Sequence, residues 1–209
     1  KLDEAEISYR QAITLKPDYA EAHYNLGIIL QELGKLHEAE ISYRQTITLK
    51  PELSEAHNNL GNILKKLGKL DEAEISYRQA ITLKPDLAKA HYNLGIILQE
   101  LGKLNEAEIS YRQTITLKPD LAKAHYNLGI ILQELGKLDE AEISYRQAIT
   151  LKPDLAKAHY NLGNTLKELE KLDEAEISYR QAITLKPELT VAHNNLGNTL
   201  KELGKLDEA

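Results

Sequence analysis

The sequence predicts an all-α solenoid, and three observations support this prediction. First, a 34-residue segment recurs along the 209-residue chain without insertion or deletion. Second, each copy contains two runs of apolar residues at helical spacing, separated by short breaks. Third, composition does not shift along the chain, so no linker or second domain is indicated. Helix pairs of fixed length that stack on their neighbours form an α-solenoid.

The repeat boundaries follow from aligning the copies. A partial repeat covers residues 1–19, and another covers residues 190–209. The full repeats between them span residues 20–53, 54–87, 88–121, 122–155 and 156–189. We therefore expect a single array over residues 1–209.

Each repeat is predicted to contain two helices. In the repeat that starts at Ala20, the apolar pattern of the first helix is broken at Gly34, and the second helix ends before Pro51. Asp71 and Glu74 have the spacing of an N-terminal cap on a second helix. Glu170 stands where the other repeats have the turn glycine, and we expect a loss of about 1 kcal/mol if that turn needs a positive φ.

The pattern within each repeat resembles the tetratricopeptide repeat family. In the repeat that starts at Ala20, the matching residues are His23, Leu26, Gly27, Leu30, Ala39, Tyr43, Thr46 and Pro51. Two departures recur: His replaces the first aromatic residue of the family pattern, and Leu replaces the second. The resemblance implies a right-handed superhelix of 34-residue helix-turn-helix repeats whose first helices line the concave face. It also implies close approach of the helices at Gly27 and Ala39, with Tyr43 filling the space beside them.

Composition excludes several classes of site and partner. The chain has no Cys, so disulfides, thiolate catalysis and Cys-based zinc sites are excluded. A formal net charge of -6 argues against nucleic acid or an anionic membrane as a partner. No apolar run approaches the roughly 18 residues that cross a bilayer. We expect a cytoplasmic chain, and because it begins without Met, we expect it to be part of a longer protein.

The recurring histidines and carboxylates favour structural roles. Six histidines recur every 34 residues at a packing position: His23, His57, His91, His125, His159 and His193. Helices that pack about 8–10 Å apart do not bring such residues to one metal ion, whose ligands lie about 2 Å away. The carboxylates gather at helix N-termini, where negative charge is favourable. We therefore predict no catalytic residue, no metal site and no cofactor.

A ladder of asparagines is the strongest functional signal. The same position of every first helix holds Asn25, Asn59, Asn93, Asn127, Asn161 or Asn195. Asn has low helix propensity, and its side chain offers the donors and the acceptor that match a peptide unit. A spacing of about 10 Å between neighbouring helices corresponds to about three residues of extended chain. The ladder resembles the tetratricopeptide arm of the O-linked N-acetylglucosamine transferases, which holds protein substrates by their backbones. The alternative is that these residues help neighbouring repeats to pack.

The predicted groove also contains residues that vary between repeats. These candidate binding residues are Tyr24, Tyr92, Tyr126, Tyr160, Asn62, Asn164, Asn198, Lys89, Lys123 and Lys157. The lysines match one lysine of the family's clamp for chaperone tails. The clamp's other cationic positions hold Asn or Tyr in this chain, which argues against a chaperone-tail receptor.

The sequence therefore predicts a protein-interaction scaffold that binds an extended peptide or protein segment in a concave groove. One alternative is the substrate-recognition arm of a larger enzyme, such as a glycosyltransferase. Another is an architectural spacer or an engineered array. The ends of the chain suggest head-to-tail self-association, with residues 192–203 packing on residues 2–15 of another copy. The "KLDEA" segment occurs at both ends, in residues 1–5 and 205–209, and this overlap would have to fray or turn aside for the contact.

Overall fold

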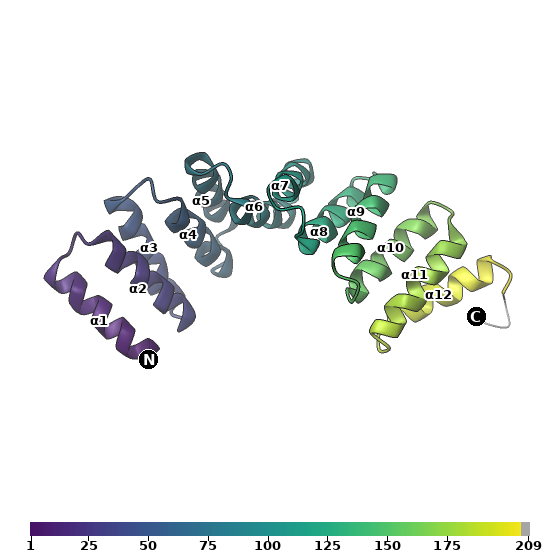
Figure 1. Cartoon of the computed structure of the whole chain (residues 1–209), viewed down its shortest axis with the longest axis horizontal. Helices are drawn as coiled ribbons and strands as arrows, with labels where there is room; N and C mark the ends of the chain where they lie inside the picture. Colours follow the sequence, from purple (N-terminus) through teal and green to yellow (C-terminus); the bar gives the residue numbers. More distant parts are fainter. Residues whose placement is uncertain (206–209) are drawn as a thin grey trace. The chain divides into compact units, whose positions relative to one another are not determined.

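A computed structural model describes residues 1–205, which form twelve α-helices and no strand (Figure 1). The chain divides into two compact units, Lys1–Gly102 (unit 1) and Lys103–Ala209 (unit 2), and each is described by itself. The division falls at the glycine turn inside the repeat 88–121. The prediction of a single array over residues 1–209 stays a prediction.

The helices alternate between the first and the second helix of each repeat. Unit 1 contains α1 (Leu2–Leu15), α2 (Ala20–Glu32), α3 (Leu36–Leu49), α4 (Ser54–Lys66), α5 (Leu70–Leu83) and α6 (Ala88–Glu100). Unit 2 contains α7 (Leu104–Leu117), α8 (Ala122–Glu134), α9 (Leu138–Leu151), α10 (Ala156–Glu168), α11 (Leu172–Leu185) and α12 (Thr190–Glu202). The even-numbered helices are the first helices, and each begins at the first residue of a predicted repeat. The predicted last helix, 192–203, begins two residues earlier and ends one residue earlier. Of the "KLDEA" segment, residues 206–209 lie outside the described residues.

A buried tyrosine of the second helix packs against the first helix in each helix pair. Tyr43 of α3 is fully buried, and a Cβ atom added at Gly27 of α2 would lie 2.8 Å from its ring. Ala39, one turn before Tyr43, is also fully buried. Because only glycine leaves room for the ring at this distance, the predicted close approach of α2 and α3 is confirmed. The same arrangement recurs between Gly129 of α8 and Tyr145 of α9 in unit 2.

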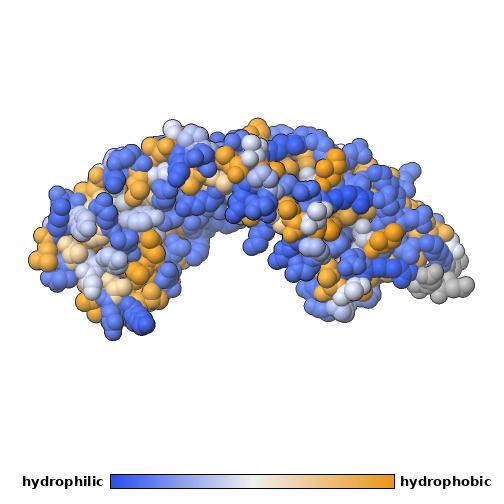
Figure 2. Space-filling model, viewed as in Figure 1, coloured by the Kyte–Doolittle hydropathy of each residue, from blue (hydrophilic) through white to orange (hydrophobic). Residues whose placement is uncertain are grey.

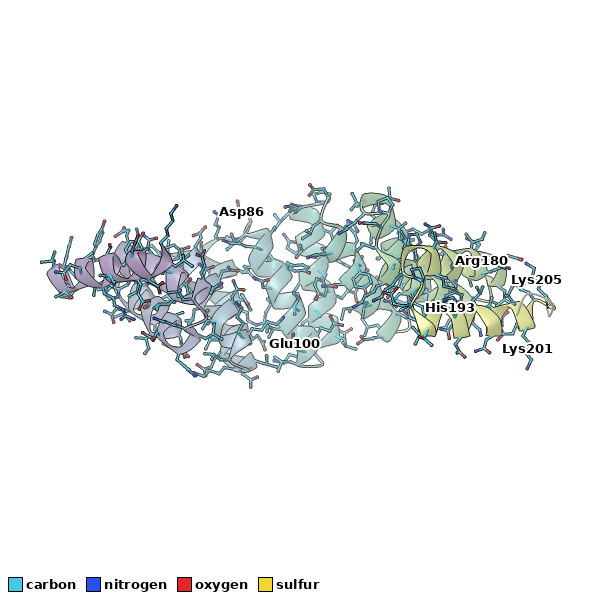
Figure 3. All side chains as sticks on the ribbon, turned by 90° about the horizontal axis from the view of Figure 1, so that it is seen from below. Asp86, Glu100, Arg180, His193, Lys201 and Lys205 are labelled. Atoms are coloured by element: carbon cyan, nitrogen blue, oxygen red, sulfur yellow. The ribbon has the colours of Figure 1, made fainter. Side chains whose placement is uncertain are left out.

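The turns define two edges of each unit. At the glycine-turn edge a first helix leads into its second helix, and Gly34 has φ 75°. Glu170 has φ 60° at the equivalent position, so the condition attached to the expected loss of stability at this turn is met. At the proline-turn edge, a second helix ends at a Lys-Pro turn that leads into the next first helix. In Figure 3, Asp86 at the proline-turn edge and Glu100 at the glycine-turn edge lie at opposite ends of α6.

The predicted N-terminal cap is wrong. Lys69 occupies the cap position of α5, and none of the helices described has a side chain bonded to its free N-terminal amides. Asp71 lies inside the first turn of α5, and Glu74 instead forms an ion pair with Arg78 at 2.8 Å. Acidic residues in this turn still interact favourably with the helix dipole.

The second helices of neighbouring repeats are joined by ion pairs. Glu40 of α3 pairs with Arg44 one turn later and with Lys69 of the next repeat, both at 2.9 Å. Arg44 also reaches Glu72 of α5 at 2.6 Å. Although desolvation opposes the shift, hydrogen bonds from Lys69 and Arg44 lower the pKa of Glu40. Equivalent pairs recur in unit 2 around Glu142.

Candidate functional site

The predicted binding residues lie on the face formed by the first helices of each unit, here called the first-helix face. The six ladder asparagines are all half-buried. Tyr24, Tyr92, Tyr126 and Tyr160 are half-buried beside them, as are Asn62 and Asn164. Asn198 and the three candidate lysines are exposed. The ladder side chains are therefore shared between the interior and the surface.

In unit 1 two of the three ladder asparagines, Asn59 and Asn93, donate hydrogen bonds to the preceding repeat. Nδ2 of Asn59 donates to the hydroxyl of Tyr24 at 3.2 Å. Nδ2 of Asn93 donates to Oδ1 of Asn58 at 3.2 Å and to Oδ1 of Asn62 at 3.0 Å. The interpretation that these asparagines help repeats to pack therefore has direct structural support, although several of the bonds are long.

Unit 2 repeats this arrangement. Nδ2 of Asn161 donates to the hydroxyl of Tyr126, and Nδ2 of Asn195 donates to the hydroxyl of Tyr160, both at 3.4 Å. Asn195 also donates to Oδ1 of Asn164 at 2.9 Å. Asn161 and Asn195 thus each meet a predicted Tyr of the preceding first helix, whereas Nδ2 of Asn127 donates to the hydroxyl of Tyr111 on the second helix α7, at 3.4 Å.

The buried tyrosines reveal two kinds of repeat. Where a first helix carries Asn62 or Asn164, the hydroxyl of the buried tyrosine donates to that asparagine at 2.8 or 2.9 Å. Where it carries Ile130, the hydroxyl of Tyr145 donates instead to Gln133 at 3.2 Å. Burial raises the pKa of these tyrosines, so they remain protonated donors at neutral pH.

The glutamine partner of the buried tyrosine was not predicted, although the sequence carries a signal for it. Two positions of the first helix, three residues apart, vary together. Repeats with Ile at the first position, such as Ile130, have Gln at the second, and repeats with Asn at the first position, such as Asn62, have Lys at the second. In the Asn repeats this lysine is directed to the next first helix. Lys65 pairs with Glu100 at 3.0 Å, and Lys167 pairs with Glu202 at 2.7 Å.

A hollow opens at the ladder in unit 2. It encloses about 400 Å³ and is lined by Asn164, Lys167, Glu168, Tyr179 and Asn195. Two of these residues, Asn164 and Asn195, were predicted as binding residues. Lys167, Glu168 and Tyr179 were not predicted as binding residues. The walls offer neutral amides together with one charge of each sign, which suits hydrogen bonding to a peptide.

A second hollow lies at the proline-turn edge of unit 1. It encloses about 230 Å³ and is lined by Ala20, Glu21, Tyr24, Lys50, Leu53 and Glu55. Only Tyr24 among these residues was predicted. Burial raises the pKa of the Tyr24 phenol, and the bond from Asn59 opposes this shift.

The histidines do not face the ladder. Nε2 of His23 lies 2.9 Å from the carbonyl oxygen of Pro17, so this nitrogen must carry the proton and donate to the proline turn. In the other five recurring histidines, Nε2 makes the same contact with the carbonyl oxygen of the proline six residues earlier. In residues 1–205, no three His, Asp or Glu side chains gather as a metal site. The histidine rings therefore bond to the proline turns that precede their helices.

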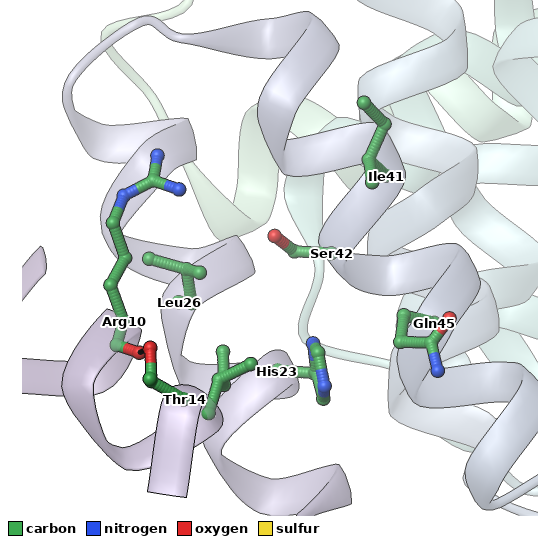
Figure 4. A pocket seen from close by; sticks show the side chains of 8 residues that line it. Arg10, Thr14, His23, Leu26, Ile41, Ser42 and Gln45 are labelled. Carbon is green, nitrogen blue, oxygen red and sulfur yellow. Dashed lines mark hydrogen bonds between the residues drawn. The ribbon is translucent and has the colours of Figure 1, made fainter. Parts of the chain in front are cut away.

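The opposite face carries a repeated hollow between successive second helices. In unit 1 it encloses about 500 Å³, with Arg10 from α1, His23 from α2, and Ser42 and Gln45 from α3 (Figure 4). The equivalent hollow in unit 2 contains Arg146 and His159. Ile41 on its rim is 68% exposed, but hydrophobic residues on the surface shown in Figure 2 form small patches separated by hydrophilic ones.

The sequence predicts no segment that crosses a bilayer, and the lengths and hydropathy of the helices test this prediction. None of those in residues 1–205 combines the length and the apolar character that a bilayer crossing requires.

Comparison with protein families gives a consistent result along the chain. Models described as TPR repeat match residues 1–34 and 61–102. Models described as Tetratricopeptide repeat match residues 20–53, 42–75, 86–154 and 120–188. The chain belongs to the tetratricopeptide repeat family. No curated protein matches this tetratricopeptide chain.

Solved structures share the fold of this tetratricopeptide chain. YrrB, described as a TPR protein with an unusual peptide-binding site, is 23% identical with a TM-score of 0.81, covering 89% of this chain and 96% of its own. MamA from Desulfovibrio magneticus is 20% identical with a TM-score of 0.76, covering 81% and 96%. PilF from Pseudomonas aeruginosa is 20% identical with a TM-score of 0.78, covering 96% and 90%. At these identities the likeness concerns the fold.

Proposed function

We propose that this tetratricopeptide chain is a protein-interaction scaffold that binds an extended peptide or protein segment along its first-helix face. Binding would use the backbone of the segment, through the asparagine ladder. The described residues would act by holding a partner and would not catalyse a reaction.

One observation supports this proposal most strongly. In Asn161, Nδ2 is held by the hydroxyl of Tyr126, whereas Oδ1 accepts no hydrogen bond within residues 1–205. Oδ1 of Asn93 is likewise without a donor in the described part of the chain, while its Nδ2 is held by Asn58 and Asn62. Each side chain is therefore fixed by one end and offers an oriented acceptor at the other. A peptide N–H can bind to such an acceptor with little loss of side-chain entropy.

The packing bonds and the binding role are compatible, because they use different atoms of the same amide. The bond to the preceding repeat orients the asparagine, and the half-buried position leaves part of it accessible. The similarity to YrrB adds support, since that protein is described as having a peptide-binding site.

A peptide-array screen tests the proposal. We expect the chain to bind a subset of peptides, and the combined substitution Asn93→Ala, Asn127→Ala and Asn161→Ala to weaken that binding more than tenfold. Each net hydrogen bond contributes roughly 0.5–1.5 kcal/mol, so three losses exceed a factor of ten. The matched control is Gln79→Ala, Gln147→Ala and Gln181→Ala, which removes three exposed amides from the second helices.

The outcomes separate the alternatives. Retained binding in the ladder variant, with helical circular dichroism unchanged, would contradict the ladder proposal. Absence of any binding peptide would favour the architectural alternative. Binding confined to peptides that a covalently attached catalytic domain modifies would favour the arm of a larger enzyme.

A further inference from the structure

The charges at the proline-turn edge differ between the two units. In unit 1, Glu21 at the start of α2 pairs with Lys50 at the end of α3, with 3.6 Å between Nζ and Oε1. Glu55 at the start of α4 pairs in the same way with Lys84, at 3.5 Å. The hollow of unit 1 at this edge is lined by two glutamates, Glu21 and Glu55, and one lysine, Lys50.

Unit 2 replaces both glutamates with lysines. Three repeats further along the chain, the residues equivalent to Glu21 and Glu55 are Lys123 and Lys157, while Lys152 is equivalent to Lys50. The helices there have the same bounds relative to the repeat, so the arrangement that brings Glu21 to Lys50 brings Lys123 to Lys152. Tyr126 and Leu155, equivalent to Tyr24 and Leu53, are half-buried in the same way. We call Lys123, Lys152 and Lys157 the lysine cluster.

The lysine cluster is not neutralised by its surroundings. None of its three members forms an ion pair within the described residues. The nearest acidic residues in sequence, Asp120 and Asp154, are exposed in the turns and are not paired with it. Lys186, which follows α11 as Lys152 follows α9, is paired only loosely with Glu188 at 3.7 Å.

This arrangement is unfavourable for the isolated protein. Lys123 and Lys157 lie in the first turns of α8 and α10, where the helix dipole disfavours positive charge. Each also occupies the position at which unit 1 has a glutamate in an ion pair with a lysine. The ion pairs of unit 1 show that the fold accepts glutamate here, so folding does not require the lysines.

We propose that the lysine cluster binds acidic side chains of the peptide segment held by the first-helix face. The proposal rests on the proposed function and adds the charge preference of the ligand. The cluster is next to the ladder, because Tyr126 follows Lys123 by three residues on α8 and accepts the hydrogen bond from Asn161 of α10. An acidic residue of the segment would therefore meet the lysines while the neighbouring backbone meets the ladder.

The test compares three proteins on one peptide array, and within each bound sequence it compares versions that carry Glu or Gln. The first protein is the parent chain. The second carries Lys123→Glu and Lys157→Glu, which gives unit 2 the charges of unit 1. The third carries Glu21→Lys and Glu55→Lys, which gives unit 1 the charges of unit 2 and serves as the matched control.

We expect the parent to bind the Glu versions about tenfold more tightly than the Gln versions at low salt, with the preference decreasing as salt is raised. The Lys123→Glu, Lys157→Glu protein should lose this preference. The Glu21→Lys, Glu55→Lys protein should show an equal or larger preference.

An unchanged preference in the Lys→Glu protein would overturn the inference, as would equal binding of both versions by the parent. Either result would leave the proposed function intact if the Asn93, Asn127 and Asn161 variant still weakened binding of the Gln versions. Absence of any bound peptide would overturn both proposals.

Discussion

The contact between glycine and tyrosine inside each repeat gives a sharp prediction. A Cβ atom added at Gly129 would lie 2.6 Å from Cε1 and 2.7 Å from Cδ1 of Tyr145, which is fully buried. The substitution Gly129→Ala would therefore push α8 and α9 apart. Gly197 occupies the equivalent position of α12, and a Cβ atom added there would meet no described atom within 4 Å.

The magnitude follows from two opposing terms. Alanine in place of glycine in a helix interior stabilises by about 1 kcal/mol. Overpacking of a close-packed core costs about 1–3 kcal/mol, and a contact this short requires the upper end of that range. We therefore expect Gly129→Ala to destabilise the chain by about 2 kcal/mol and Gly197→Ala to stabilise it by about 1 kcal/mol.

Thermal and urea unfolding followed by circular dichroism measure the difference. A loss of about 2 kcal/mol corresponds to a decrease in Tm of about 4–8 °C for a chain of this size. Two variants that raise Tm equally would refute the reasoning, because the ring of Tyr145 would then have room to move.

The remaining predictions concern charge and backbone conformation. The substitution Glu170→Gly should stabilise the chain by about 1 kcal/mol in urea unfolding, since its φ of 60° is costly for a residue with a Cβ atom; no gain would show that the turn adapts. Burial opposes ionisation of Glu40, but hydrogen bonds from Lys69 and Arg44 place its pKa below the ordinary value of 4.5. The stabilisation is therefore complete above pH 4.5, and stability should decrease as the pH falls through the folded pKa. A urea midpoint of unfolding that is the same at every pH between about 7 and 3 would contradict this. The double substitution Lys123→Glu and Lys157→Glu should raise the free energy of unfolding by about 1–2 kcal/mol, because glutamate interacts favourably with the helix dipole. The new glutamates would also form ion pairs with Lys152 and Lys186. A loss of stability would show that the two original lysines contribute to folding.

The fold was predictable because its signals are local and repeated. Gly27 and Tyr43 recur at a fixed spacing, and the Lys-Pro turn ends every second helix, so both helices of a repeat could be placed from sequence. The cap at Asp71 was assigned wrongly because the cap position is held by Lys69, two residues earlier, and Asp71 falls inside the first turn. Propensity identifies the region of a helix start more reliably than its first residue.

The candidate site was only partly predictable. The position of the ladder asparagines follows from the repeat, but their partners do not. The bond from Asn93 to Asn62 joins residues of different repeats, and its existence depends on the packing of α4 against α6. The pairing of Glu21 with Lys50 likewise joins opposite ends of two antiparallel helices. Such contacts depend on tertiary geometry, which the spacing of residues alone does not specify.

Selective 15N labelling of asparagine side chains tests the central claim most directly. Eleven of the twelve asparagines lie on first helices, and Asn105 on α7 provides an internal reference. During titration with a peptide identified by the array, we predict that the side-chain amide signals of Asn93 and Asn161 shift in proportion to occupancy, whereas that of Asn105 stays in place. Saturable binding with unchanged ladder signals and a shifted Asn105 signal would contradict binding on the first-helix face.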